Sequence, residues 1–240
     1  VSNSLCKESA YERSSYLISK GPRPTFVVPG NSDWFDCPRR EEAYGFFMKS
    51  VGSPDFITSN WHQEHYISLN IERPEGNPEL VRFYVEGILF IGVHMIESPL
   101  NHESSSARDG RMKLNMEWLA ESVETTFADR EVRGVVVFGH SVVHQRIKPF
   151  FKKMANYLGN VTSRREIPAI YLHGDGLAWK VNRTSADDSS WYFYDVQIEQ
   201  SGLADITIVD VAPQRKGKLK DRKSTRLNSS HTVISYAVFC

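Results

Sequence analysis

Three short apolar runs, each followed by a glycine and a polar side chain, constrain the fold of this chain more than any other feature. The runs are residues 25–28, 135–138 and 170–172, and the polar residues that follow them are Asn31, His140 and His173. Continuous β-branched runs of this kind are typical of strands that are buried on both faces. Ligands of an open α/β sheet bind beyond the carboxyl ends of its strands, so the pattern predicts one site at that edge of the sheet.

The elements between these runs alternate along the chain, which favours an α/β fold. Periodic apolar residues predict helices over 7–20, 40–51, 111–127 and 143–158, the last interrupted at Pro149. Residues 81–85 and 88–93 read as a hairpin that turns at Glu86-Gly87, and further strands are expected at 191–198 and 206–211. We therefore expect one α/β domain over residues 1–220, with an antiparallel sheet in its second half.

The two ends of the chain are expected to lie outside this scheme. Residues 221–240 resemble a translated sequencing adapter, so we interpret them as an artefactual or disordered tail and leave them out of the fold prediction. A native edge strand at 232–239 is the other interpretation of this segment. Val1 opens in mid-sequence, with no initiator Met, which suggests a fragment of a longer protein.

Composition excludes some classes of partner and leaves the compartment open. The chain carries 29 basic and 29 acidic residues, so no basic excess indicates nucleic acid, and no apolar stretch is long enough to span a membrane. Cys6 and Cys37 either form a disulfide or remain free thiols. Together with the glycosylation sequons at Asn160 and Asn182 they allow secretion, but they do not establish it.

The polar residues at the predicted strand ends are metal-ligand types. Asn31, His140, His173 and Asp175 offer amide oxygen, imidazole nitrogen and carboxylate oxygen, which suit iron, manganese and zinc. Two such ions about 4 Å apart polarise a phosphoryl oxygen and lower the pKa of a shared water. The sequence thus predicts metal-assisted chemistry at the carboxyl edge of the sheet.

Three motifs together resemble the calcineurin-like metallophosphoesterase family. VVPGNSDWFDC, at 27–37, is similar to the family's Gly-Asn-His-Asp/Glu block, VVVFGHSVVH, at 135–144, to its isolated metal-binding His, and YLHGDGLAW, at 171–179, to its terminal His-x-His block. The resemblance runs from about Ser4 to Val211. It implies an α/β/β/α sandwich of two sheets flanked by helices, whose first strands this chain lacks.

By this resemblance the chain derives from a phosphoester hydrolase, a phosphatase or phosphodiesterase, that uses a hydroxide activated by two divalent or trivalent Fe, Mn or Zn ions. Asn31, His140 and His173 would bind one metal, and Asp175 would bind the other. Trp34 and Trp179 follow the ligand blocks and would line the substrate cleft. The expected partner is a phosphorylated small molecule or another phosphoester.

The chain also departs from the family pattern. The Asp-x-His and Gly-Asp-x-x-Asp blocks are absent, Leu177 stands where relatives often carry a further His, and Ser32 stands at the position of the catalytic His, beside Asp33. Serine has no pKa near neutrality and cannot replace imidazole as a general acid. We therefore expect at most one well-formed metal site and very low activity, and we attribute the missing blocks to truncation.

Several structural interpretations compete with this prediction. Asn31 after Pro-Gly is also a common turn residue, His140 could be a core histidine, and His173 with Asp175 could belong to a glycine-centred loop. A serine hydrolase built on the GHSVV pentad at 139–143 is disfavoured, because the nucleophile elbow of such enzymes ends in Gly, whereas this pentad ends in Val143. A non-catalytic binding or scaffold module of the phosphoesterase fold remains the alternative function.

Overall fold

The computed structural model describes residues 6–34, 37–97, 103–142, 146–176, 179–183 and 193–199. Its helices are α1 (Glu8–Ser19), α2 (Asn31–Trp34), α3 (Arg40–Lys49), α4 (Phe56–Asn60), α5 (Ser105–Asp129) and α6 (Lys148–Arg165), with short 3₁₀ turns at Gln63–His65 and Ile67–Leu69. Its strands are β1 (Val81–Val85), β2 (Ile88–Gly92), β3 (Gly134–Gly139), β4 (Ala169–Gly176), β5 (Lys180–Arg183) and β6 (Phe193–Glu199).

The strands form one six-stranded sheet in the order β1-β2-β3-β4-β6-β5. Strands β2, β3, β4 and β6 run parallel, whereas β1 and β5 pair antiparallel at the two edges. Helix α5 connects β2 to β3 and helix α6 connects β3 to β4, as parallel neighbours require. The carboxyl ends of β2, β3 and β4 therefore share one edge of the sheet.

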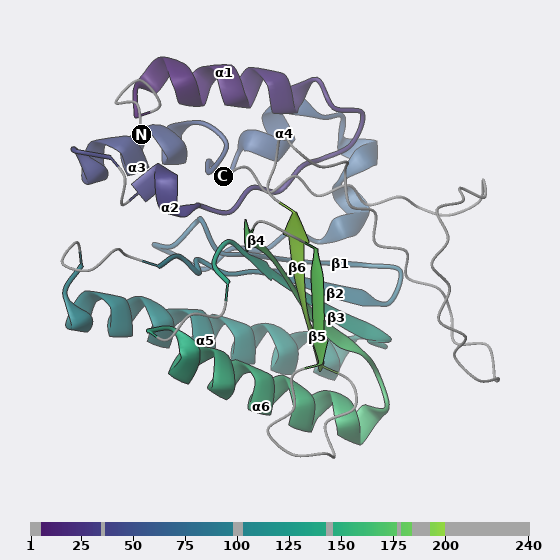
Figure 1. The fold of residues 1–240 in the computed structure, drawn as a ribbon. Coiled ribbons are helices and arrows are strands. Elements are labelled where there is room, and N and C mark those ends of the chain that lie inside the picture. The colour runs from purple at the N-terminus through teal and green to yellow at the C-terminus, as the bar shows by residue number, and fades with distance from the viewer. Residues whose placement is uncertain are drawn as a thin grey trace.

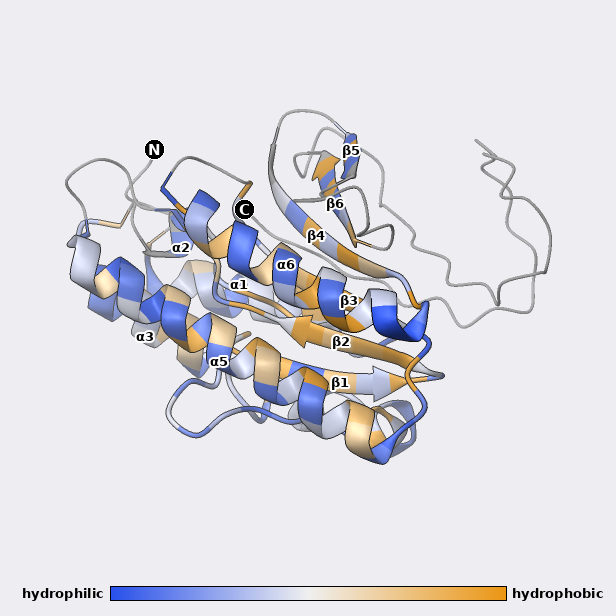
Figure 2. Ribbon diagram, turned by 90° about the horizontal axis from the view of Figure 1, so that it is seen from below, coloured by the Kyte–Doolittle hydropathy of each residue, from blue (hydrophilic) through white to orange (hydrophobic). Residues whose placement is uncertain are grey.

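Helices cover both faces of this sheet (Figure 1). Helices α5 and α6 pack on one face, where Leu119, Val137 and Tyr171 belong to a buried core. Helices α1 to α4 cover the other face, over a second core that includes Phe47 and Phe83. Figure 2 shows the hydrophobic residues concentrated on β2 and β3, while α5 and α6 alternate between hydrophobic and hydrophilic positions. Strands β2 and β3 at the centre of the sheet are thus buried on both sides, as continuous apolar runs require.

Most predicted elements are confirmed, but some of their boundaries are shifted. The helix predicted over 143–158 corresponds to α6, which spans Lys148–Arg165. Helix α5 begins six residues before the predicted start at 111, because Ser104 caps it by accepting a hydrogen bond from the Ala107 N–H at 3.1 Å. Pro149 lies in the first turn of α6 and does not interrupt it, since proline is well tolerated where the N–H has no helical partner. The predicted strand at 206–211 lies outside the described residues.

The predicted strand at 25–28 is wrong, although its burial was predicted correctly. Phe26, Val27 and Val28 are buried, and the Phe26 ring stacks on Phe83 at 4.0 Å between ring centroids. The segment is nevertheless irregular, and none of the strands within the described part of the chain pairs with it. A β-strand needs a neighbouring strand for its backbone hydrogen bonds, and an apolar, β-branched run alone does not provide one.

The second half of the fold also differs from the expectation. Its strands β4 and β6 pair parallel, and of the strands described there only β5, which was not predicted, runs antiparallel, beside β6. Cys6 and Cys37 form a disulfide, which resolves the alternative that the sequence left open. Among the described residues, no helix has the length and apolar character needed to cross a membrane.

Candidate functional site

Asn31 and His140 both lie at the carboxyl edge of the sheet. Asn31 begins α2, directly after the buried segment 25–28, and His140 directly follows β3. The Asn31 Oδ1 accepts a hydrogen bond from the Glu97 N–H at 2.8 Å and lies 3.4 Å from the Ser141 Oγ, which can donate to it. The amide is therefore anchored to the segments that follow β2 and β3, as expected for a site built on strand ends.

Gly30 allows His140 and Asp33 to approach the same backbone position. A Cβ atom at Gly30 would lie 3.2 Å from His140 Nδ1 and 3.3 Å from Asp33 Oδ2. The Asp33 Oδ2 accepts a hydrogen bond from the Gly30 N–H at 2.9 Å. Burial raises the pKa of the Asp33 carboxyl to about 6, and the hydrogen bond from Gly30 opposes this only in part. A carboxylate in this position would be stabilised by a nearby cation.

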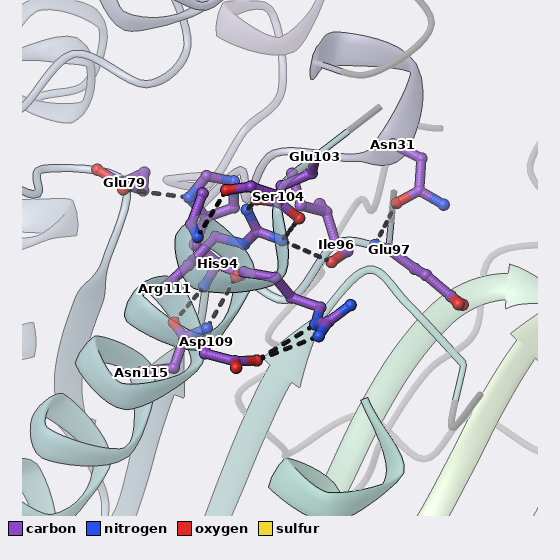
Figure 3. A network of polar contacts seen from close by, with 12 residues as sticks. Asn31, Glu79, His94, Ile96, Glu97, Glu103, Ser104, Asp109, Arg111 and Asn115 are labelled. Atoms are coloured by element: carbon purple, nitrogen blue, oxygen red, sulfur yellow. Dashed lines mark hydrogen bonds and ion pairs between the residues drawn. The ribbon is translucent and has the colours of Figure 1, made fainter. Parts of the chain in front are cut away.

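Side chains of α5 hold the segment after β2 that reaches Asn31 (Figure 3). Asn115 accepts a hydrogen bond from the His94 N–H at 3.0 Å and donates one to the His94 carbonyl at 2.8 Å. Arg111 donates to the Ile96 carbonyl at 3.2 Å and forms an ion pair with Glu103. The segment therefore has a fixed path, which delivers the Glu97 N–H to the Asn31 amide.

The same network contains a buried carboxylate and imidazole that the sequence did not single out as a pair. His94 Nδ1 lies 3.2 Å from Glu79 Oε1, and both residues are buried. Burial lowers the pKa of His94 despite the adjacent carboxylate. Burial alone would raise the pKa of Glu79, but the hydrogen bond with His94 holds it below its ordinary value. A neutral His94 that donates to an ionised Glu79 satisfies both directions, and this pair has a structural role.

His173 lies near the end of β4, opposite Gly139 of β3. Its ring stacks on Tyr171 with 5.0 Å between ring centroids, and the Tyr171 hydroxyl donates to the Ser141 carbonyl at 3.0 Å. Its Nε2 lies 2.7 Å from Asp195 Oδ1 and its Nδ1 lies 3.0 Å from the Gly174 carbonyl oxygen. The structure therefore brings His173 to the predicted edge of the sheet, with both ring nitrogens beside acceptor atoms.

The two candidate imidazoles face opposite sides of the sheet. His140 packs against Gly30, on the side covered by α1 to α4, whereas His173 packs on Tyr171, on the side of α5 and α6. Within the described ranges, no three His, Cys, Asp or Glu side chains are close enough to hold a metal ion. The ligand-type groups nearest to one another are the Asp33 carboxyl and the His140 imidazole, which both approach Gly30, and the Asn31 amide, which contacts Ser141 beside His140. Their mixed oxygen and nitrogen chemistry fits one cation, not two.

Of the remaining predicted residues, only one has a described side chain. Trp179 is 48 % exposed and directly precedes β5. The side chains of Ser32, Trp34 and Asp175 lie outside the described part of the structure, although their backbones belong to α2 and β4. Asp195, which contacts His173, was missed, and its only signal was an acidic residue within the otherwise apolar and aromatic start of β6.

A pocket of about 230 Å³ lies elsewhere, between β1 and the second half of α5. It is lined by Asn70, Glu72, Arg82, Phe83, Tyr84, Leu89, Thr125, Thr126, Asp129 and Arg130. Arg82 in this pocket already contacts Glu72 and Glu121, and its guanidinium lies over the Trp118 ring. The pocket contains none of the predicted site residues, so it has no part in the site at the strand ends.

Comparisons with protein-family models, with curated proteins and with solved structures give no match for this chain. The resemblance of the three motifs at 27–37, 135–144 and 171–179 to a known family therefore remains a prediction from the sequence.

Proposed function

We propose that this chain carries part of the active site of a metal-dependent phosphoester hydrolase of the calcineurin-like type. One observation carries the proposal: Asp33 and His140 approach each other at Gly30, where a Cβ atom would touch both, and the Asn31 amide contacts Ser141, the residue after His140. These residues come from two of the three motifs that resemble the family. An α/β fold that brings ligand-type side chains to the carboxyl edge of its sheet supports the proposal.

In this proposal the chain's own residues bind and orient. The Asn31 amide oxygen and a His140 nitrogen would hold one cation, with the Asp33 carboxyl beside them. The Glu97 N–H and the Ser141 hydroxyl keep the amide oxygen directed toward the strand ends. A bound metal would polarise a phosphoryl oxygen of the substrate and lower the pKa of a bound water. His173 would stay outside this site, because its ring packs on the other side of the sheet and both of its nitrogens lie beside protein acceptors.

The chain should hold at most one metal ion and turn over very little substrate. It lacks the Asp-x-His and Gly-Asp-x-x-Asp blocks that supply the other metal site in the family it resembles, and Ser32 replaces the usual general acid. The two-sheet sandwich of that family and the phosphorylated substrate remain part of the proposal, whereas the second metal ion is proposed only for the parent enzyme. The described strands form a single sheet.

Metal stoichiometry and phosphatase activity test the proposal together. The full chain, dialysed against Zn²⁺ or Mn²⁺, should retain about one equivalent, and His140→Ala should lose it, because an imidazole ligand is removed. His62→Ala is the matched control, since His62 is exposed and lies in the irregular segment after α4. No retained metal in the wild-type chain, or equal retention by His140→Ala, would contradict the proposal. Turnover of p-nitrophenyl phosphate that His140→Ala abolishes would show that the site is more complete than proposed.

The contacts of His173 favour a second candidate, a non-catalytic binding module. Both of its ring nitrogens lie within hydrogen-bond distance of protein acceptors, as in a structural histidine. A module of this kind would bind a phosphorylated ligand without hydrolysing it and without retaining metal. Equilibrium binding of a phosphorylated ligand by the metal-free chain, unaffected by chelator, would favour this candidate over the hydrolase.

A further inference from the structure

A disulfide and two glycosylation sequons are not explained by the candidate site at the strand ends. Cys6 and Cys37 form the disulfide, and the sequons begin at Asn160 and Asn182. In eukaryotic cells, structural disulfides form mainly in the endoplasmic reticulum, which is also where Asn-x-Ser/Thr sequons receive their glycans. The disulfide therefore gives both sequons a bearing on the chemistry of this chain, and the structure distinguishes between them.

Asn160 lies on the outward face of α6, in the helical layer that covers one side of the sheet (Figure 1). Leu158 and Thr162 on the same helix are both 0 % exposed, whereas Asn160 is exposed. A glycan on the Asn160 Nδ2 would therefore extend into solvent without displacing the core. Asn160 belongs to the C-terminal half of α6, and this helix begins after the carboxyl end of β3. The glycan would thus leave the strand-end site open.

The hydroxyl of this first sequon is hidden in the folded chain. The Thr162 Oγ1 donates to the Leu158 carbonyl at 2.7 Å within α6, and Thr162 is buried. A glycosyltransferase recognises both the Asn amide and the hydroxyl of the Asn-x-Thr tripeptide. Because the packed helix exposes only the amide, the glycan can be attached only before α6 folds against the sheet.

The sequence around Asn160 keeps the sequon out of a helix until that packing occurs. Residues 159–163 are Gly, Asn, Val, Thr and Ser, all weaker helix formers than Ala or Leu. A helix in a protein is stabilised mostly by the packing of its apolar face, so this part of α6 should not be helical in the nascent chain. The tripeptide is therefore accessible to a transferase before folding and closed to it afterwards.

Asn182 differs from Asn160 because its amide has a structural role. Asn182 lies on β5, and its Nδ2 donates to Asp195 Oδ2 at 3.2 Å. Asp195 is buried, and its Oδ1 lies 2.7 Å from His173 Nε2. A sugar on the Asn182 Nδ2 would replace one of the two amide hydrogens and crowd this contact between β5 and β6. The structure therefore favours Asn160 over Asn182 as the modified residue.

We propose that Asn160 is a site of N-linked glycosylation, modified before α6 folds, and that Asn182 stays unmodified. The oligosaccharide comes from a lipid-linked pyrophosphate donor. The bond between Asn160 Nδ2 and the sugar C1 forms as the bond between C1 and the pyrophosphate oxygen breaks. The amide loses one proton to solvent, and the lipid pyrophosphate leaves with the electron pair of the broken bond. This inference does not depend on the proposed hydrolase function.

Expression of the full chain in mammalian cells, behind a cleavable leader that directs it to the endoplasmic reticulum, tests the site. Peptide N-glycosidase should lower the apparent mass of the wild-type chain and convert Asn160 to Asp, which peptide mass spectrometry detects. Asn160→Gln should lose the glycan, and Thr162→Ser should keep it, because serine preserves the hydroxyl of the sequon. Thr184→Ala is the matched control: it removes the second sequon, leaves the Asn182 amide in place and should not change the glycan.

A second experiment tests the order of modification and folding. The full chain purified from bacteria, without glycan, is incubated with solubilised microsomes and the lipid-linked donor, either folded and oxidised or reduced and unfolded. Only the unfolded chain should be glycosylated, and equal glycosylation of the folded chain would overturn the proposed order. A wild-type chain secreted without a glycan, or a glycan that Asn160→Gln retains, would overturn the site. A glycan that Thr184→Ala removes would overturn the assignment of Asn182 as unmodified.

Discussion

The disulfide between Cys6 and Cys37 allows a quantitative prediction. It closes a loop with a sequence separation of 31, which contains α1 and the α2 residues Asn31 and Asp33. In the chain-entropy model, a cross-link over about 31 residues removes roughly 12 cal/mol/K from the unfolded chain, or about 4 kcal/mol at 25 °C. Because folded domains of this kind are stable by about 5–15 kcal/mol, the Cys6→Ala/Cys37→Ala variant should lose a large part of its free energy of unfolding.

Guanidinium titration of the oxidised wild-type chain and of this double variant measures the difference directly. Cys240→Ala, a substitution of the third cysteine of the chain, is the matched control and should leave the unfolding midpoint of the oxidised protein unchanged. Reduction of the wild-type chain should reproduce the loss seen in the double variant. A free energy of unfolding equal to that of the wild type, within the roughly 10–15 % uncertainty of the extrapolation, would refute the argument.

Three further predictions each concern the substitution of a single residue. Gly30→Ala should separate His140 from Asp33 and lower the free energy of unfolding by about 1–3 kcal/mol. The control is Gly110→Ala, which should raise it by about 0.5–1 kcal/mol, because the space around the Cβ position in α5 is open. Urea titration of both variants measures these changes. Burial raises the pKa of Asp33 from its ordinary value of 3.8 to about 6, so the folded state binds this proton more tightly than the unfolded chain does. The resulting stability is fully present at low pH and is lost as the pH rises through about 4–6. The pH profile of Asp33→Asn, measured by urea titration, should lack this loss. Ser104→Ala removes the cap of α5 and should cost about 1 kcal/mol, measured by thermal unfolding.

The sequence predicted the elements that depend on local pattern. The hairpin of β1 and β2 was placed correctly, because a glycine between two apolar runs is a local signal for a tight turn. Glu86 and Gly87 both adopt positive φ in this turn, a conformation that glycine tolerates. The start of α5 was missed because its first six residues are mostly polar and show no apolar period, although Ser104 is a favourable cap. Local chemistry therefore gave most of the fold, and boundaries that depend on a single cap were harder to predict.

Features that depend on distant partners were harder to predict. The segment at 25–28 has strand composition, but only the arrangement of the other strands decides whether it is paired. The contact of Asp195 with His173 depends on the register of β4 against β6, in which Asp195 faces Tyr171 and lies diagonal to His173. The direction of the His173 ring likewise follows from its place on β4. Neither the register nor the ring direction can be read from residue spacing alone.

The two edges of the sheet are protected from association with other molecules in different ways. At β1, Glu72 exchanges two backbone hydrogen bonds of 2.9 Å with Arg82. The segment around Glu72 therefore occupies backbone N–H and C=O groups of the edge strand with which another chain could otherwise pair. The β5 edge has only four residues and carries Lys180, but it also exposes Val181. Among the described strands, β5 therefore offers the less protected edge for sheet extension between copies of this protein, and the charge of Lys180 opposes such pairing there.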